Sequence, residues 1–147
     1  MTTVINRTLI LAAAAMTLGM TAASAQTNTR FKAEIPFAFQ IGNQSYDAGS
    51  YDATVGVSTG GFRTLLIRAA GSSGSKLAMS TGSLSPVAAH RELTGPKMVF
   101  RCGDSACVLT QVWPGNAPEG LLFNAPKSTA AGTQRLAVVR MQTLNAD

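Results

Sequence analysis

The most regular pattern in this chain is an alternation of apolar and polar residues over positions 31–41. One face of this segment would carry Phe31, Ala33, Ile35, Phe37, Phe39 and Ile41. A period of two residues predicts a β-strand with one buried face. Pro36 lies on the other face and has no backbone N–H, so we expect the strand to lie at a sheet edge or to carry a bulge there. Gly42 and Asn43 then predict a turn.

Short apolar runs separated by turn residues predict further strands along the chain. We expect these strands over residues 51–57, 62–70, 76–81, 97–102, 107–113 and 135–143. The last segment has apolar residues on both faces, so a helix is the alternative there. Residues 82–96 have the composition of a polar loop. The whole pattern predicts an all-β fold, an antiparallel sandwich or small barrel of about seven or eight strands.

The N-terminal segment, positions 1–25, has the features of a secretory signal peptide. Arg7 supplies positive charge, and residues 8–20 form an apolar stretch that is too short to span a bilayer as a helix. An A-x-A site follows, which predicts cleavage between Ala25 and Gln26. We therefore expect the signal peptide to be removed during export to the periplasm or the extracellular space.

The mature chain would be a single β domain, residues 26–147, with a modest positive charge. This length is enough for one hydrophobic core. The whole chain has 12 Lys+Arg and 7 Asp+Glu, and loss of Arg7 leaves 11 against 7, a net charge of +4. These charges are scattered, whereas a nucleic-acid surface needs clustered basic residues with stacking aromatic residues. No other apolar run reaches the ~18 residues of a spanning helix. We expect no nucleic-acid partner and no membrane span in the mature form.

Both cysteines lie in one short segment, and four residues separate Cys102 from Cys107. A four-residue loop is a common hairpin connection. An exported chain is in an oxidising compartment, where a pair of cysteines is expected to form a disulfide. The sequence therefore predicts a structural disulfide, which would stabilise the fold by about 2 kcal/mol as a local clamp.

The disulfide also predicts how the two neighbouring strands pair. Opposed cysteines place Phe100 opposite Leu109 and Met98 opposite Gln111. The face shared with the cysteines would then carry Met98, Phe100, Leu109 and Trp113. This face is apolar, so the register implied by the disulfide agrees with the register implied by burial.

Other uses of the cysteine segment fit the sequence less well. A structural zinc site needs four ligands, and the chain has two cysteines and one histidine. A redox pair favours the Cys-x-x-Cys spacing on a thioredoxin-like fold. A hydrolase would have to combine Ser105 or Asp104 with His90, on a scaffold much smaller than such enzymes use. We therefore assign no catalytic, cofactor-binding or metal-binding residue.

The remaining candidates have ordinary structural interpretations. Carboxylates are potential cation ligands, and the four considered are Asp47, Asp52, Asp104 and Glu119. No metal-loop spacing gathers them, so turn and surface positions are expected. Trp113 is a possible anchor for a partner or a sugar, and packing in the core is the expectation that we prefer.

Several short motifs occur in a recognisable order. They are Ile35-Pro36-Phe37-Ala38-Phe39, Gly42, Ala48-Gly49-Ser50-Tyr51, Met98-Val99-Phe100 and Gln111-Val112-Trp113. In this order the chain resembles a family of short secreted bacterial β-rich proteins with a V/I-P-F-x-F, A-G-x-Y and Q-V-W pattern, over roughly residues 31–115. Relatives carry an aromatic residue near each cysteine position, so the disulfide would replace an aromatic cross-strand pair. The resemblance implies fold and export, and carries over no catalytic residue.

These observations lead to an expected function and an alternative. We expect an exported, non-enzymatic β domain with a binding or structural role in the bacterial cell envelope, where an envelope protein would be the partner. The alternative is a carrier, because a closed barrel of about eight strands can hold one small apolar ligand. In that case the six phenylalanines would line a cavity.

Overall fold

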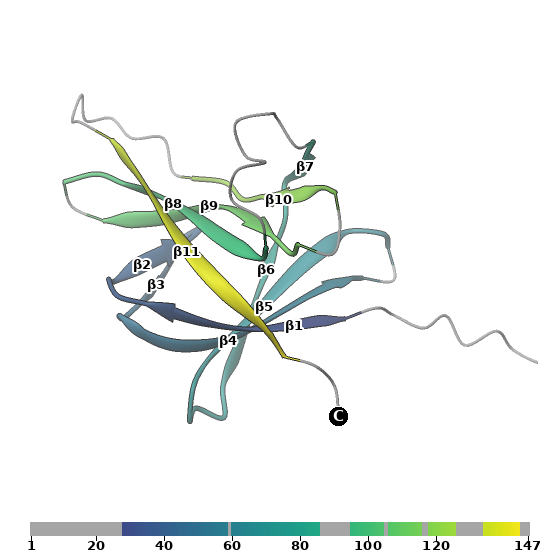
Figure 1. Ribbon diagram of the computed structural model, residues 1–147, viewed down its shortest axis with the longest axis horizontal. Helices are drawn as coiled ribbons and strands as arrows, with labels where there is room; N and C mark the ends of the chain where they lie inside the picture. The colour runs from purple at the N-terminus through teal and green to yellow at the C-terminus, as the bar shows by residue number, and fades with distance from the viewer. Residues whose placement is uncertain are drawn as a thin grey trace, which may run out of the picture.

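The computed structural model describes residues 28–58, 60–85, 95–104, 106–115, 118–125 and 134–144 (Figure 1). The predicted signal peptide and its Ala25–Gln26 cleavage site lie outside these residues. The described chain forms eleven β-strands and no helix, which confirms the all-β fold class. The strands are β1 Thr29–Ile35, β2 Phe39–Ile41, β3 Gln44–Tyr46, β4 Gly49–Val57, β5 Arg63–Ala69, β6 Ser75–Met79, β7 Gly82–Leu84, β8 Lys97–Cys102, β9 Cys107–Trp113, β10 Gly120–Leu122 and β11 Arg135–Leu144.

Nine of the strands form a curled sheet, a half-barrel, in the order β3-β2-β9-β8-β11-β1-β4-β5-β6, and β10 joins it by pairing with β9 and with β7. All described strand pairs are antiparallel except β2 with β9. Figure 1 shows β8, β9 and β10 in an upper layer and β1 and β4 in a lower one. β11 crosses between the layers, since residues 135–140 pair with β8 and residues 141–144 pair with β1. This segment is therefore a strand, not the alternative helix.

The alternation over residues 31–41 is confirmed, but the segment is two strands. β1 is not an edge strand, because β11 and β4 pair with its two sides. Pro36 cannot donate to a ladder, so β1 ends before it and the chain leaves the lower layer. β2 then joins β9 in the upper layer. Phe31 and Ile35 of β1 and Phe39 and Ile41 of β2 are still buried in one core.

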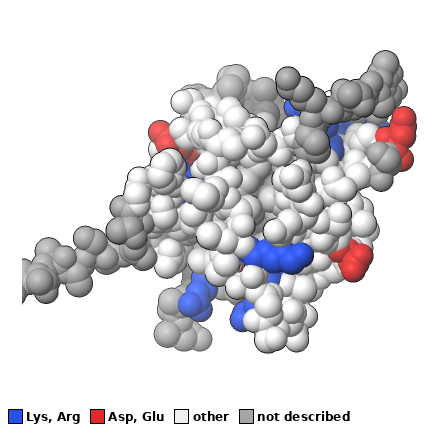
Figure 2. Space-filling view, turned by 180° about the vertical axis from the view of Figure 1, so that it is seen from behind, with Lys and Arg blue, Asp and Glu red and all other residues white. Residues whose placement is uncertain are grey.

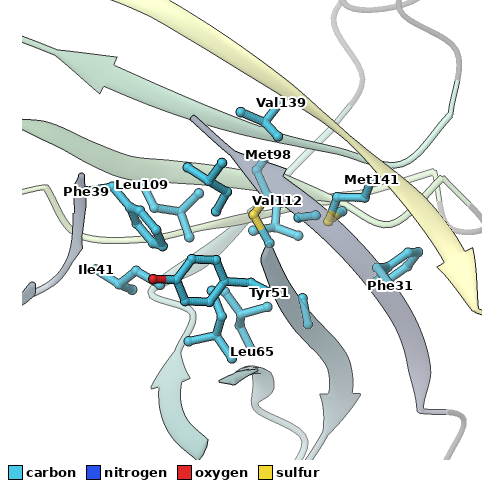
Figure 3. Packing of buried hydrophobic residues seen from close by; sticks show 14 of the residues in the cluster. Phe31, Phe39, Ile41, Tyr51, Leu65, Met98, Leu109, Val112, Val139 and Met141 are labelled. Atoms are coloured by element: carbon cyan, nitrogen blue, oxygen red, sulfur yellow. The ribbon is translucent and has the colours of Figure 1, made fainter. Parts of the chain in front are cut away.

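Aromatic side chains from both layers fill the middle of this core. The ring of Phe39 lies edge-to-face against Phe100 and against Tyr51, with centroids 5.4 and 5.3 Å apart. Figure 3 shows Phe39 and Leu109 of the upper layer pointing towards Tyr51 and Leu65 of the lower layer. The Tyr51 hydroxyl donates to the backbone carbonyl of Asp47 at 2.6 Å, so its polar end has a partner. Burial raises the pKa of Tyr51, with a smaller contribution from the nearby Asp47 carboxylate.

The β8–β9 hairpin has the predicted ends and the predicted disulfide. Cys102 pairs with Cys107 across the two strands and is bonded to it. Phe100 lies opposite Leu109, as the disulfide register requires. Both half-buried cysteines pack against the core. The bridge therefore joins the core-facing sides of the two strands next to their turn.

Further along the hairpin the predicted register is wrong by one residue. Met98 lies opposite Val112, not Gln111, because a bulge follows the Phe100–Leu109 pair. The additional residue is Thr110, whose hydroxyl donates to the backbone carbonyl of Val99 at 3.0 Å. One additional residue moves every later side chain of β9 to the other face.

The bulge places Trp113 away from the core, contrary to the expectation that it shares the cysteine face. Its side chain is only 7% exposed and lies opposite Lys97 on the outer side of the sheet. Gly120 lies directly against the indole, where an added Cβ would come within 2.7 Å of the ring. The indole N–H donates to the Gln111 side-chain oxygen at 3.0 Å. Trp113 is therefore structural and packs in a smaller cluster outside the main core.

Candidate functional site

The carboxylates considered as cation ligands are dispersed over the surface. Asp52 forms an ion pair with Arg68 at 3.0 Å, and Glu119 forms one with Arg63 at 3.1 Å. Asp47 contributes its backbone carbonyl to Tyr51. Within the described residues, no group of three or more His, Cys, Asp or Glu side chains could hold a metal ion. The carboxylates are thus explained by turns and surface ion pairs.

The residues of the hydrolase interpretation are not brought together by the described chain. Asp104 is exposed in the β8–β9 turn, beside the backbone hydrogen bond from Gly103 N–H to the Ala106 carbonyl. His90 and Ser105 lie outside the described residues. The absence of catalytic function therefore stays a prediction from sequence.

The sheet leaves a seam between the two ends of its strand order, β3 and β6. The seam is closed along one half, because β6 continues into β7, which pairs with β10, and β10 pairs with β9. A backbone bond of 2.8 Å from Thr81 N–H to the Leu122 carbonyl begins this closure. Along the other half, β6 has β5 as its only partner among the described strands. In the same way, β3 has only β2 as its described partner. Two strand edges therefore face a gap at this end.

A groove of about 350 Å³ lies in the open half of the seam. Its lining residues are Ile41, Gly42, Asn43, Gln44, Tyr46, Leu77, Ala78, Met79, Thr81, Phe123 and Asn124. Apolar side chains and uncharged polar groups make up this lining, and none of these residues carries a charge. The volume is at the small end of the range for ligand sites. The groove thus suits a narrow, largely uncharged occupant.

Tyr46 bridges the seam but is not available for stacking. Its ring is parallel to Phe39, with centroids 5.0 Å apart, and the Lys76 ammonium lies 4.9 Å from the ring centroid. Its hydroxyl donates to the Gln44 side-chain oxygen at 3.2 Å. Burial raises the pKa of Tyr46, and Tyr51 raises it further, so the phenol stays neutral at physiological pH. Because Phe39 and Lys76 both contact this ring, a sugar stacked on it is disfavoured.

Three exposed apolar side chains lie on the outer face of β5 and β6, and we call them the β6 patch; two of them, Leu77 and Met79, also line the groove. Leu77 is 60% exposed, Met79 is 56% exposed, and Leu66, which pairs with Leu77, is 37% exposed. At about 200 Å² for a large side chain, the patch exposes roughly 300 Å². Apolar patches of this size on a monomer are often functional. Figure 2, the view from behind, also shows that most of that side of the molecule has no charged side chain.

A second groove, of about 290 Å³, lies on the outer face of the lower layer. Arg30, Asp52 and Arg68 line it, together with serines and Leu144. The Asp52–Arg68 ion pair partly neutralises this surface. Ser75 of β6 also lines it, but this groove carries three charged side chains, whereas the lining of the seam groove carries none, so the seam is the better candidate for a binding site.

The sequence predicts a strand near β6 but does not reveal the seam. The strand bounds were expected over 76–81, and Leu77 and Met79 alternate with Lys76 within it. That alternation is the only local signal of an apolar outer face. Which strands are neighbours, and which edge stays unpaired, depends on contacts between distant segments.

No protein family, no curated protein and no solved structure matches this chain. The resemblance to short secreted bacterial proteins therefore stays a prediction. In the part of the chain that the structure describes, no helix is long and apolar enough to cross a membrane.

Proposed function

We propose that this protein is an exported, non-enzymatic β domain that binds a partner in the bacterial cell envelope. The observation that carries the proposal is the open half of the seam, where an uncharged groove and the β6 patch adjoin a strand edge that no described strand pairs with. Folded domains rarely leave such an edge accessible, because it is prone to pair with other chains. A surface that combines these three features is suited to binding another molecule.

Export is supported by two independent features of the chain. The N-terminal segment, positions 1–25, has the charge, apolar stretch and cleavage site of a signal peptide. The Cys102–Cys107 disulfide is typical of an oxidising compartment such as the periplasm or the extracellular space. The net charge of +4 in the mature chain gives no sign of a nucleic-acid partner.

The carrier alternative is less well supported than surface binding. A carrier would hold its ligand where aromatic side chains surround a central cavity. Here Phe31, Phe39 and Phe100 are almost completely buried, and the last two contact each other directly. Phe62, in contrast, is exposed in the β4–β5 turn. The interior rings thus behave as core packing.

The experiment that tests the proposal follows the protein exported with its own signal. The denatured mass should show loss of the segment from Met1 to Ala25 and of two hydrogens from the cysteines. A photo-crosslinking amino acid at Met79 in the β6 patch should then give a defined adduct in the envelope. The same probe at Gln142, an exposed position on β11 four strands away, is the matched control.

Three results would contradict parts of the proposal. Retention of the segment from Met1 to Ala25 would exclude export by cleavage of this signal. Adducts of equal yield at Met79 and Gln142, or none at either, would argue against binding at the seam. An apolar compound that remains bound in the native mass spectrum and is lost on denaturation would favour the carrier.

A further inference from the structure

We propose that the outer edge of β6 binds an extended segment of a partner polypeptide, which adds to the sheet as a strand in the open half of the seam. This inference rests on the proposed binding function and specifies its partner. Strand addition to a free edge is a recurring mode of peptide recognition, in which backbone hydrogen bonds supply affinity and alternate side chains supply specificity.

The backbone bonds of β5 determine which groups of β6 face the seam. Ala70 N–H donates to the Ser50 carbonyl, so even-numbered residues of β5 bond to β4. Ser80 N–H donates to the Arg63 carbonyl, so odd-numbered residues of β5 bond to β6. Hydrogen-bonded pairs alternate along an antiparallel ladder. The backbone groups of Lys76 and Ala78 therefore point to β5.

The residues between them point the other way. Ser75, Leu77 and Met79 direct their backbone N–H and carbonyl groups away from β5, towards the seam. Thr81 continues this series, and its N–H already donates to the Leu122 carbonyl of β10 at 2.8 Å. Among the described residues, the same edge is thus paired beyond Met79 and has no partner strand before it. A guest strand would extend the line of β10 along β6.

The side chains beside this edge define the guest sequence. Guest residues opposite Ser75, Leu77 and Met79 would lie on the outer face and extend the β6 patch, so they should be apolar. Guest residues opposite Lys76 and Ala78 would face the groove. Lys76 is the cation at this end, the groove lining has no carboxylate, and opposite charges are favourable across strands. We therefore expect an alternating segment with an acidic residue opposite Lys76.

A second copy of this chain is a poorer occupant of the same edge. Antiparallel pairing of two β6 strands about Leu77 places Lys76 opposite Ala78, which leaves both ammonium groups without a carboxylate. Two β6 patches together expose roughly 600 Å², below the ~1,200 Å² of a stable interface. Each mature copy also carries a charge of +4. Charge and area both disfavour a second copy, and charge favours a partner segment with one acidic residue opposite Lys76.

The decisive variant removes one backbone donor from the edge. Leu77→Pro deletes an N–H that points into the seam and leaves the β5–β6 ladder intact, as proline is tolerated where an edge N–H faces solvent. Leu77→Ala is the matched control, because it loses the same apolar side chain and keeps the N–H. Both variants should retain the wild-type near-UV circular dichroism, and their urea midpoints should agree with each other within error, because both lose the same contact with Leu66.

The probe is a soluble seven-residue peptide that alternates valine and threonine, with a glutamate replacing the threonine that faces Lys76. Its dissociation constant is measured by fluorescence anisotropy, and the bound register by amide shifts of Leu77 and Met79. Leu77→Pro should weaken binding by about tenfold relative to Leu77→Ala. Lys76→Glu should reverse the preference, so that a lysine-containing peptide binds several-fold more tightly than the glutamate peptide.

Each other result overturns strand addition by a partner segment with an acidic residue opposite Lys76. Equal affinity of Leu77→Pro and Leu77→Ala, or no binding of the peptide to wild type, would do so. A concentration-dependent dimer in sedimentation that Leu77→Pro abolishes would make a second copy the occupant. Crosslinking from Met79 in the envelope that survives Leu77→Pro would retain the binding function and exclude strand pairing. Absence of any crosslink would instead refute the binding function itself.

Discussion

Reduction of the Cys102–Cys107 disulfide should cost about 2 kcal/mol of unfolding free energy and leave the domain folded. The cysteines are five positions apart, so the bond closes only a very short loop. The entropy lost by an unfolded chain on closing such a loop corresponds to about 2 kcal/mol. The turn also has its own backbone bond from Gly103 N–H to the Ala106 carbonyl. Domains of this size have total stabilities of about 5–15 kcal/mol.

The assay is equilibrium unfolding in urea of the oxidised protein, the reduced protein and the Cys102→Ala/Cys107→Ala double variant. Reduction removes the bond and keeps both sulfurs, which pack against the core. The double variant also removes those sulfurs, so its loss should be slightly larger. A loss above about 4 kcal/mol, or unfolding on reduction alone, would refute the local clamp. An unchanged midpoint would show that the bond does not constrain the unfolded chain.

Three further predictions concern single side chains. Gly120→Ala should lower the unfolding free energy in urea by about 1–3 kcal/mol, because the added Cβ would come within 2.7 Å of the Trp113 ring. Gly103→Ala is the control: no atom lies within 4 Å of its added Cβ, so the loss should be less than about 1 kcal/mol. Tyr51→Phe should cost about 1 kcal/mol by the same measurement, because the hydroxyl loses a 2.6 Å hydrogen bond to a backbone carbonyl. Burial lowers the pKa of Lys97, so between that pKa and the usual 10.5 the unfolded state binds more protons than the folded state. The unfolding free energy of wild type minus that of Lys97→Met should therefore rise with pH across this window, and a flat difference would contradict it.

The part of the fold that the sequence predicts well is governed by local periodicity. The bounds of β8 and β9 agree with expectation to the residue, because each is a continuous run ending in a cysteine turn. The alternation over 31–41 correctly identifies the buried face on both sides of Pro36. It does not show that the chain changes layers there, since a proline is compatible with an edge, a bulge or a break.

The bulge at Thr110 is the clearest failure of local reasoning. Threonine is a common strand residue, and nothing in the segment from Leu109 to Trp113 distinguishes a bulge from a regular strand. The register changes because Val112, not Gln111, is the residue buried opposite Met98. Burial of the Val112 side chain stabilises the fold by more than the unpaired ladder position at the bulge costs, so the register with the bulge is the more stable one.

The seam and the ambiguous last strand depend on the rest of the chain. Four strands have only three residues, β2, β3, β7 and β10, and the sequence predicts none of them as a separate strand. β2 pairs with β9 and β7 pairs with β10, which are distant in the sequence, and β3 forms a local hairpin with β2. Residues 135–143 are apolar on both faces because Leu136 and Val138 are exposed on the outer side while Val139 and Met141 enter the core. A strand whose outer face is apolar has no distinct period, which left the helix alternative open.

The position of β11 between the two layers also determines when the domain can fold. Arg30 in the first strand pairs with Leu144 in the last, so the ladder that joins the layers links opposite ends of the described chain. Contacts of such high sequence separation require a large loop to close first, which slows folding. During synthesis, β1 would therefore have only β4 as a partner until the last strand, β11, has been made. A chain that ends before β11 would lack both ladders that join the two layers, so we expect it not to fold.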